Sequence, residues 1–260
     1  MTHALSAAGI DVVRSFLADP VLVAFDFDGT LAPIVDDRDR ARIPRRRRSR
    51  LRAIARVAPV AVVSGRRRED VEPRVAGLGV RHVIGVHGLD PGTVAGADVA
   101  VVDALREVLV PALGGLPGVD VEDKGVGLAV HYRAAPDHAA ARAAIDEALA
   151  GVPVAHRAIP GHAVVDVMPP GAAGKGGAVR RLCVLEGVTR VLYVGDDVTD
   201  EDVFSLEAGP EVLGVRVGSH STTAARLHLG ATDEIDLLLD VVRSSLRVGP
   251  AGIEPATERL

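Results

Sequence analysis

Two aspartates separated by a single residue occur in the segment Asp26-Phe-Asp28-Gly-Thr30. They follow the apolar run 21–25, which has the pattern of a buried strand, and alternate residues of an extended chain point to the same side. Neighbouring carboxylates repel each other unless a cation or a shared proton compensates their charge. Because carboxylate oxygens suit Mg²⁺, the pair predicts a metal site at the carboxyl end of a strand, where open α/β sheets bind ligands.

A second acidic segment follows the apolar run 191–194 and reads Gly195-Asp196-Asp197-Val-Thr199-Asp200-Glu201. Acidic residues are favourable in the first turn of a helix, which accounts for Glu201 and offers an alternative for Asp200. Asp196 and Asp197 precede the expected helix, so this argument does not account for them. We therefore expect these carboxylates to join the first pair.

Two further segments carry groups suited to an oxyanion. Ser64-Gly65-Arg66 follows the apolar run 60–63, and a hydroxyl with backbone N–H groups at a helix start can hold an anion. Gly174-Lys175-Gly176-Gly177 opens a helical segment. Alone, the first is typical of an ordinary turn and the second of a flexible loop with a solvated lysine. Beside the acidic strand ends, they predict a cation that faces a phosphate.

Short apolar runs and helical segments alternate in the two outer parts of the chain. Strand patterns occur at 21–25, 60–63, 81–84, 191–194 and 212–215. Helical spacing occurs at 3–18, 45–56, 68–77, 174–186, 200–207, 221–228 and 234–246. Strands that are apolar on both faces and alternate with helices predict an α/β fold, with a parallel, Rossmann-like sheet covered by helices on both faces. We expect this core to comprise residues 1–90 and 169–248.

The middle of the chain has a different pattern. Helices are expected near 98–112 and 136–150, and strands at 119–123, 127–132, 153–158 and 162–168. Lys124-Gly125 is a short hairpin signal, as is Pro160-Gly161, so neighbouring strands should pair antiparallel. We therefore expect residues 91–168 to be an inserted α+β module, and residues 249–260 to be a loose tail.

Composition excludes several classes of protein. The 260 residues carry a net charge of −5 and only 2% aromatic residues, which argues against nucleic acid as a partner. A single cysteine, Cys183, excludes a disulfide framework and a cysteine zinc site. The first residues lack a signal-peptide pattern, and no apolar run approaches the ~20 residues that span a bilayer. We expect a cytoplasmic protein without a membrane partner, either a monomer or a small homo-oligomer.

The basic residues are almost all arginines. Of the 30 lysines and arginines, only Lys124 and Lys175 are lysines. Both lie in segments selected on other grounds, and a compact ammonium is not equivalent to a planar guanidinium. We therefore expect both to contact substrate. The arginine run 45–48 could form a nucleic-acid patch, but the acidic balance favours the solvated face of a helix that begins after Pro44.

Together, these motifs resemble those of the haloacid dehalogenase superfamily of phosphohydrolases: an Asp-x-Asp-Gly-Thr box, a strand-terminal Ser, a Lys and a Gly-Asp-Asp box, in that order. Within the superfamily, the sequence is similar to the trehalose-6-phosphate phosphatase family. The matching stretches are FDFDGTLAPI (25–34), PVAVVSGR (59–66), GVHGLD (85–90), Asp123-Lys124, His131-Tyr-Arg133, PPG…KG (169–176) and YVGDDVTDEDVF (193–204). An inserted cap of the C2 type between the Ser and Lys motifs is also a feature of that family.

The resemblance implies Mg²⁺-dependent hydrolysis of trehalose 6-phosphate in trehalose biosynthesis. Asp26 would form an aspartyl-phosphate, Asp28 would act as general acid and base, and Ser64 and Lys175 would balance charge on the phosphoryl oxygens. The metal would be held by Asp26, Asp196 and the backbone carbonyl of Asp28. Asp197 or Asp200 would orient its water ligands. The implied substrate-binding residues are Gly29, Thr30, Gly65, Arg66, His87, Asp90, Glu122, Lys124, His131, Arg133 and Asp166.

The sugar side leaves alternatives open. Charged residues on the strands of the inserted module can equally form a solvated sheet face. The family usually has Glu where this chain has Asp90 and Asp166, and the spacing before Lys175 is one residue longer. The substrate could therefore be another sugar phosphate, of the sucrose-phosphate or mannosyl-phosphoglycerate type. A sugar phosphotransferase and a catalytically inactive binding module are the other classes.

Overall fold

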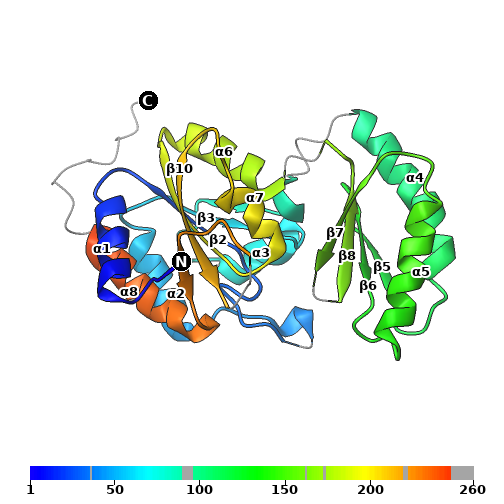
Figure 1. The fold of residues 1–260 in the computed structure, drawn as a ribbon, viewed down its shortest axis with the longest axis horizontal. Coiled ribbons are helices and arrows are strands. Elements are labelled where there is room, and N and C mark those ends of the chain that lie inside the picture. The colour runs from blue at the N-terminus through cyan, green and yellow to red at the C-terminus, as the bar shows by residue number, and fades with distance from the viewer. Residues whose placement is uncertain (36, 90–95, 162, 172–173, 219–221, 247–260) are drawn as a thin grey trace.

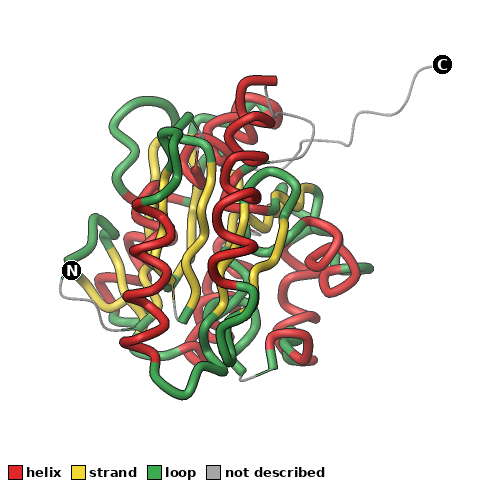
Figure 2. The backbone as a smooth tube through the Cα atoms, turned by 90° about the vertical axis from the view of Figure 1, so that its right-hand side faces the viewer, coloured by secondary structure: helices red, strands yellow, loops and turns green. Residues whose placement is uncertain are grey.

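The structure is a computed structural model, and it describes residues 1–35, 37–89, 96–161, 163–171, 174–218 and 222–246. These residues form two β-sheets with helices packed against them (Figures 1 and 2). The expected tail 249–260 and Asp90 lie outside the described residues. No helix in the described ranges combines the length and the apolar character needed to cross a membrane.

The described helices run as follows: α1 (Ala7–Phe16), α2 (Arg45–Ile54), α3 (Arg68–Val75), α4 (Gly96–Leu113), α5 (His138–Ala150), α6 (Gly174–Glu186), α7 (Glu201–Phe204) and α8 (Ile235–Leu246). Short 3₁₀ turns include η1 (Arg38–Arg40), η2 (Val86–Gly88), η4 (Val198–Asp200) and η5 (Thr232–Glu234). The strands are β1 (Thr2–His3), β2 (Leu22–Phe25), β3 (Val60–Val63), β4 (His82–Ile84), β5 (Asp120–Asp123), β6 (Leu128–His131), β7 (Arg157–Gly161), β8 (Val164–Met168), β9 (Arg190–Gly195), β10 (Glu211–Val217) and β11 (Leu227–Leu229).

The larger sheet is parallel throughout and has the strand order β1-β11-β10-β9-β2-β3-β4. From β2 the chain adds β3 and β4 on one side, and it returns as β9 and β10 on the other. The order therefore reverses between β2 and β9, and ligands bind beside the carboxyl ends of strands at such a switch point. This sheet confirms the predicted α/β fold.

Helices cover both faces of the parallel sheet because its central strands are apolar on both sides. Val23 and Phe25 of β2 pack with α1, α2, α3 and α8, whereas Leu22 and Ala24 of the same strand pack with α6 and α7. All four β2 side chains are fully buried. Burying a Leu, Val or Phe side chain contributes roughly 1.5–3 kcal/mol, so packing on both faces holds β2 in place.

The smaller sheet is antiparallel, with the strand order β5-β6-β8-β7. Its apolar face, which includes Leu128, Val130, Val165 and Val167, packs on α4 and α5. Cross-strand register places Glu122, Ala129 and Asp166 in one row of the opposite face. Figure 1 shows α4 and α5 on the far side of this sheet from the parallel sheet, so its polar row is turned toward the strand ends of the larger sheet.

Three predicted elements differ in the structure. The segment 221–228 was expected to be helical, but Leu227–Leu229 form β11, which pairs with β10 and β1. Burial alternates there, since Leu227 and Leu229 are buried and His228 is not, which is the period of a strand. The helix expected at 3–18 is shorter, because Thr2–His3 form β1 and α1 begins at Ala7. The strand expected at 153–158 begins at Arg157 and includes Pro160-Gly161, so these residues do not form the turn.

Candidate active site

Asp26 and Lys175 form the centre of the site. Asp26 directly follows β2, its backbone N–H donates to Val194 O of β9 at 2.9 Å, and its side chain is buried. Lys175, in the first turn of α6, donates from Nζ to Asp26 Oδ1 at 2.9 Å and to Asp200 Oδ1 at 2.7 Å. Burial alone would lower the pKa of Lys175, but the charges of Asp200 and Asp26 outweigh it and raise that pKa. The ammonium is therefore held charged between two carboxylates.

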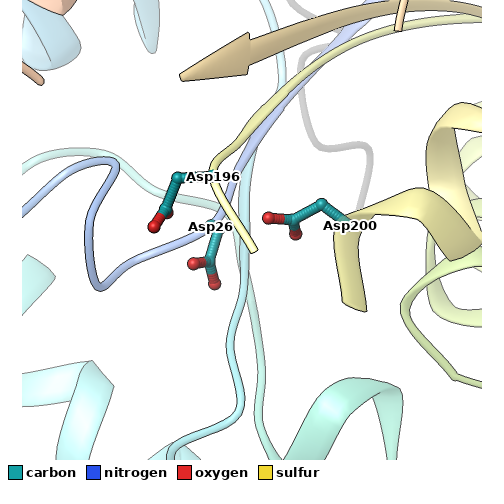
Figure 3. A group of neighbouring side chains, drawn as sticks. All are labelled: Asp26, Asp196 and Asp200. Carbon is teal, nitrogen blue, oxygen red and sulfur yellow. The ribbon is translucent and has the colours of Figure 1, made fainter. Parts of the chain in front are cut away.

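Three carboxylates gather at this point, as Figure 3 shows. One oxygen each from Asp26, Asp196 and Asp200 lie within 4.8 Å of one another, and Thr30 Oγ1 donates to Asp196 Oδ1 at 2.8 Å. Burial raises the pKa of Asp26 well above its usual value. Burial, with the charge of Asp200, raises the pKa of Asp196 to about 7. Crowded, dehydrated carboxylates of this kind are stabilised by a cation, and their oxygens fit Mg²⁺.

The other two candidate metal carboxylates have different partners. Asp28 accepts hydrogen bonds from Nε and Nη2 of Arg66 at 2.6 and 2.7 Å, a two-pronged pair. Asp197 caps η4, where its carboxylate accepts from the N–H of Val198 at 2.8 Å. Asp28 is partly exposed, with 39% of its side chain accessible, and its carboxylate is accessible to a ligand.

The segment after β3 is fixed by the one after β4. Ser64 is buried, and its carbonyl accepts from the N–H of His87 at 2.9 Å. His87 has a φ of 53°, and Val86 before it has a φ of 47°, which is strained for a β-branched residue. A Cβ at Gly65 would lie 2.5 Å from the His87 ring, so only glycine fits there. The strained backbone therefore brings the His87 ring against the phosphate-binding candidates.

The smaller sheet contributes a buried ion pair to the site. Lys124 Nζ donates to Asp166 Oδ1 at 2.6 Å and to the carbonyl of Gly65 at 2.7 Å. His87 Nε2 lies 3.0 Å from Asp166 Oδ2. Burial would raise the pKa of Asp166, but the charges of Lys124 and His87 and their hydrogen bonds hold it well below its usual value. Lys124 and Asp166 are thus part of a contact between the sheets and do not form a solvated sheet face.

Glu122, His131 and Arg133 lie on the same side of the site. Glu122 Oε2 is 2.9 Å from His131 Nε2, and Arg133 Nη1 donates to the carbonyl of Val35 at 3.0 Å. Glu122 also accepts two hydrogen bonds from Arg38 of η1. Arg38 is not among the predicted site residues, because it lies in an irregular segment with neither helical nor strand periodicity.

A cavity of about 540 Å³ lies between the two sheets and joins these groups. One wall carries the strand-end residues of the larger sheet, and the other carries polar residues of the smaller sheet. The predicted site residues among its lining are Asp26, Asp28, Ser64, Gly65, Arg66, His87, Glu122, Lys124, His131, Arg133, Asp166, Lys175, Asp196 and Asp197. Gly29 and Thr30 lie in the turn behind Asp28, where the Gly29 carbonyl accepts from Thr232 Oγ1 at 2.9 Å.

Arg47 is a second structural residue that is not among the predicted site residues. Arg45 and Arg46 are exposed, as expected of a solvated helix face, but Arg47 is only 2% exposed. Its Nη1 donates to the carbonyls of Thr30 and Leu31 at 2.8 and 2.9 Å, so it holds the turn after Asp28 from behind. Its spacing was an available signal, because positions 47, 51 and 54 share one face of a helix, and Leu51 and Ile54 are core residues.

Comparison with known proteins agrees with this geometry. Residues 24–225 match the family model described as trehalose-phosphatase. The chain is 37% identical over 211 residues to the trehalose-phosphate phosphatase of Mycolicibacterium paratuberculosis, covering 75% of this chain and 53% of that protein. It is 33% identical over 275 residues to the trehalose-phosphate phosphatase of Mycobacterium tuberculosis, covering 96% of this chain and 68% of that protein. The chain thus spans about half the length of the first of these relatives.

Among solved structures, the C-terminal domain of the trehalose-6-phosphate phosphatase of C. albicans superposes with a TM-score of 0.77. It covers 94% of this chain and 98% of that one at 24% sequence identity, a level that shows the shared fold alone. The family model, in contrast, spans well over half of the chain and includes the strand ends that carry Asp26, Ser64 and Asp196 and the first turn of α6, which carries Lys175. This chain therefore belongs to the trehalose-phosphatase family.

Proposed function

We propose that this chain hydrolyses trehalose 6-phosphate to trehalose and phosphate, as a Mg²⁺-dependent enzyme of trehalose biosynthesis. One observation carries the proposal. Lys175 bridges Asp26 and Asp200 beside Asp196, at one end of a cavity whose other wall carries polar residues of the smaller sheet. A phosphoryl group needs positive charge and an adjacent nucleophile at one end, and a sugar needs hydrogen-bonding groups at the other.

Asp26 is assigned as the nucleophile. Its carboxylate oxygen would attack phosphorus while the bond from phosphorus to the sugar oxygen breaks, giving an aspartyl-phosphate. Asp28, two residues on and open to the cavity, would give a proton to the departing sugar oxygen. In the second step Asp28 would take a proton from water, which attacks the same phosphorus and frees Asp26 and phosphate.

Lys175 and Ser64 would stabilise negative charge on the phosphoryl oxygens. Lys175 is well placed because Asp26 and Asp200 fix its ammonium group, which is buried from solvent. Arg66 Nη1 is buried without a hydrogen-bond partner among the residues that the structure describes, and we assign it to the substrate. A buried donor of this kind costs free energy until a ligand accepts from it.

The metal site would comprise Asp26, Asp196 and the backbone carbonyl of Asp28, with Asp197 or Asp200 orienting water. Bound Mg²⁺ supplies positive charge to the phosphoryl oxygens. Support comes from the three converging carboxylate oxygens and the raised pKa of Asp196, which together favour a cation. Asp200 already accepts from Lys175, from Tyr193 Oη at 2.8 Å and from the N–H of Asp197 at 2.8 Å, which suits an orienting role.

We propose that residues 91–168 act as an inserted cap on a core of residues 1–90 and 169–248, and that the cap reads the sugar. Glu122, Lys124, His131, Arg133 and Asp166 would then select substrates through hydrogen bonds. A site built from polar side chains rejects sugars that leave those groups unpaired. A cytoplasmic location and a monomeric or small oligomeric state stay predictions from composition.

The proposal is tested by phosphate release from a panel of sugar phosphates, with and without EDTA. The panel comprises trehalose 6-phosphate, glucose 6-phosphate, sucrose phosphate and mannosyl-phosphoglycerate. We expect trehalose 6-phosphate to have the highest kcat/KM and EDTA to stop its turnover. A higher kcat/KM for another member of the panel would show that this other sugar phosphate is the preferred substrate. Consumption of a sugar phosphate that requires an added acceptor sugar, with the phosphoryl group recovered on that acceptor and not as free phosphate, would indicate a phosphotransferase. No turnover of any member would indicate a binding module.

A further inference from the structure

Arg38 connects the two sheets across the cavity. It lies in η1, and residues 37–44 extend from the larger sheet toward the smaller one (Figure 1). Its Nη1 donates to Glu122 Oε2 at 2.6 Å and its Nη2 to Glu122 Oε1 at 3.2 Å. Nη1 also lies 2.8 Å from Nε2 of His131. A two-pronged guanidinium–carboxylate pair fixes orientation as well as distance.

Glu122 is the point where separate segments of the core meet the smaller sheet. Besides Arg38, Arg67 approaches it, with Nε 3.5 Å from Glu122 Oε1. The Glu122 side chain is only 15% exposed. Burial would raise its pKa, but hydrogen bonds from His131 and Arg38 lower it below its usual value. This carboxylate is therefore ionised at neutral pH and is engaged by Arg38 and Arg67.

The backbone of Arg38 contacts the chemical end of the site. Its carbonyl accepts from Nη2 of Arg66 at 2.8 Å. The same Arg66 guanidinium donates two hydrogen bonds to Asp28 and stacks 5.5 Å over the ring of Phe27. Consecutive contacts thus run from Glu122 through Arg38 and Arg66 to Asp28.

We propose that Arg38 is a positioning residue that couples closure of the smaller sheet over the cavity to the placement of Arg66 beside Asp28. The proposal rests on the proposed function, in which Asp28 handles the proton of the leaving group. When the smaller sheet docks, Glu122 fixes the guanidinium of Arg38, and the carbonyl of Arg38 then fixes Arg66. Substrates that hold the sheet closed therefore meet an ordered Asp28, whereas small phosphate esters do not gain this ordering.

The first test measures closure without substrate and does not depend on the identity of the reaction. Spin labels at Val57→Cys in the core and Val110→Cys on α4, both exposed positions, report the distance between the two parts by double electron–electron resonance. Cys183 is buried and is replaced by Ala in this background. We expect Arg38→Met to broaden the distribution of distances between the spin labels toward longer values. Arg38→Lys keeps the charge but not the two-pronged guanidinium, so its effect should be intermediate.

The matched control is Arg40→Met on the same turn. Arg40 is exposed, and its side chain has no hydrogen bond or ion pair to the described residues. We expect this variant to keep the original distribution and the original kinetics. If Arg38→Met gives the same distribution of spin-label distances as Arg40→Met, Arg38 does not hold the smaller sheet in place and the proposal is wrong.

The second test separates kcat from KM. We expect Arg38→Met to lower kcat/KM for trehalose 6-phosphate about tenfold, the size expected for one charged hydrogen bond. Both parameters should contribute, because kcat should fall and KM should rise. The effect on p-nitrophenyl phosphate should be less than about threefold. Because Glu122→Gln removes the same contact, the double variant Arg38→Met/Glu122→Gln should be no slower than the worse single variant.

Additive losses in the double variant would contradict the coupling, because they would show that the two residues act through separate contacts. Equal losses on both substrates would also contradict it. If trehalose 6-phosphate is not a substrate at all, the proposed function fails, whereas the distances between the spin labels still decide the role of Arg38.

Discussion

Nζ of Lys124 lies 2.6 Å from Oδ1 of Asp166, and both side chains are buried between the two sheets. Lys124 also donates to the carbonyl of Gly65, and Asp166 is 3.0 Å from the His87 ring. The pair therefore joins the smaller sheet to the segments that follow β3 and β4. Both lysines of the chain, Lys124 and Lys175, are buried beside aspartates, while the exposed basic positions are arginines.

Lys124→Met should destabilise the protein by about 3–5 kcal/mol, because it leaves the Asp166 carboxylate buried without its cation. Lys124→Arg keeps the charge but replaces a compact group in a packed contact, so kcat/KM for trehalose 6-phosphate should fall. Urea unfolding and phosphate-release kinetics measure the two effects. Arg106→Met is the control, since its pair with Asp123 is about 40% exposed and should be worth less than about 1 kcal/mol. Full activity of Lys124→Arg would show that the type of cation is immaterial there.

The contribution of Asp166 to stability should persist into the acidic range. Its pKa in the folded state is held below the ordinary value of 3.8 by Lys124 and His87 despite burial. A depressed pKa stabilises the fold above the unfolded pKa, and this stabilisation is lost as the pH falls through the folded pKa. The free energy of unfolding of wild type minus that of Asp166→Asn, from urea titrations, should not shrink between about pH 7 and 5 and should fall only below about pH 4. A difference that shrinks already between pH 7 and 5 would show that Asp166 is not held ionised.

Asp26→Asn should abolish both turnover and phosphoenzyme formation. The amide cannot attack phosphorus, so no aspartyl-phosphate can form. Trapping with ³²P-labelled substrate after acid quench, followed by peptide mapping, measures the phosphoenzyme directly. Wild type should carry label on the peptide that contains residue 26, and the variant should carry none. Appreciable turnover by Asp26→Asn would exclude the covalent mechanism.

Arg47→Lys should destabilise the fold by about 2 kcal/mol or more, because an ammonium cannot reach all the carbonyls that the guanidinium binds. Arg47 donates to Thr30 O, Leu31 O and, at 2.6 Å, Thr232 O. Thr30 in turn donates to Asp196, so Mn²⁺ affinity measured by electron paramagnetic resonance should fall too. Arg45→Lys, at an exposed position of the same run, is the control and should change neither property. Equal unfolding midpoints for both variants would show that the buried contacts of Arg47 contribute little.

The strand ends of the site were predictable because each combines a fully apolar run with a local polar motif. Asp26, Ser64 and Asp196 follow runs that could only be central strands, and parallel strands bring their carboxyl ends together. The motif of Lys175 opens α6, and the fold places this residue against Asp26 in spite of the additional residue before it. Local sequence was sufficient for these positions.

Other features depend on contacts that no local pattern encodes. The segment 221–228 contains small and polar residues compatible with a helix, and pairing with β10 and β1 makes Leu227–Leu229 a strand. The hydrogen-bond partner of Arg38 lies on the smaller sheet, since Glu122 is 84 residues away in the chain. Arg47 is different: it looks identical to its neighbours in a run of four arginines, but its helical spacing from Leu51 and Ile54 places it on the buried face of α2.

The most direct test of the account is the release of inorganic phosphate from trehalose 6-phosphate by the purified chain, with Mg²⁺ and without an acceptor sugar. We expect steady release of free phosphate that stops when EDTA is added and resumes with excess Mg²⁺, with kcat/KM above that for glucose 6-phosphate. Equal kcat/KM for the two substrates would contradict specificity for trehalose 6-phosphate, and undiminished release in EDTA would contradict the metal-assisted mechanism.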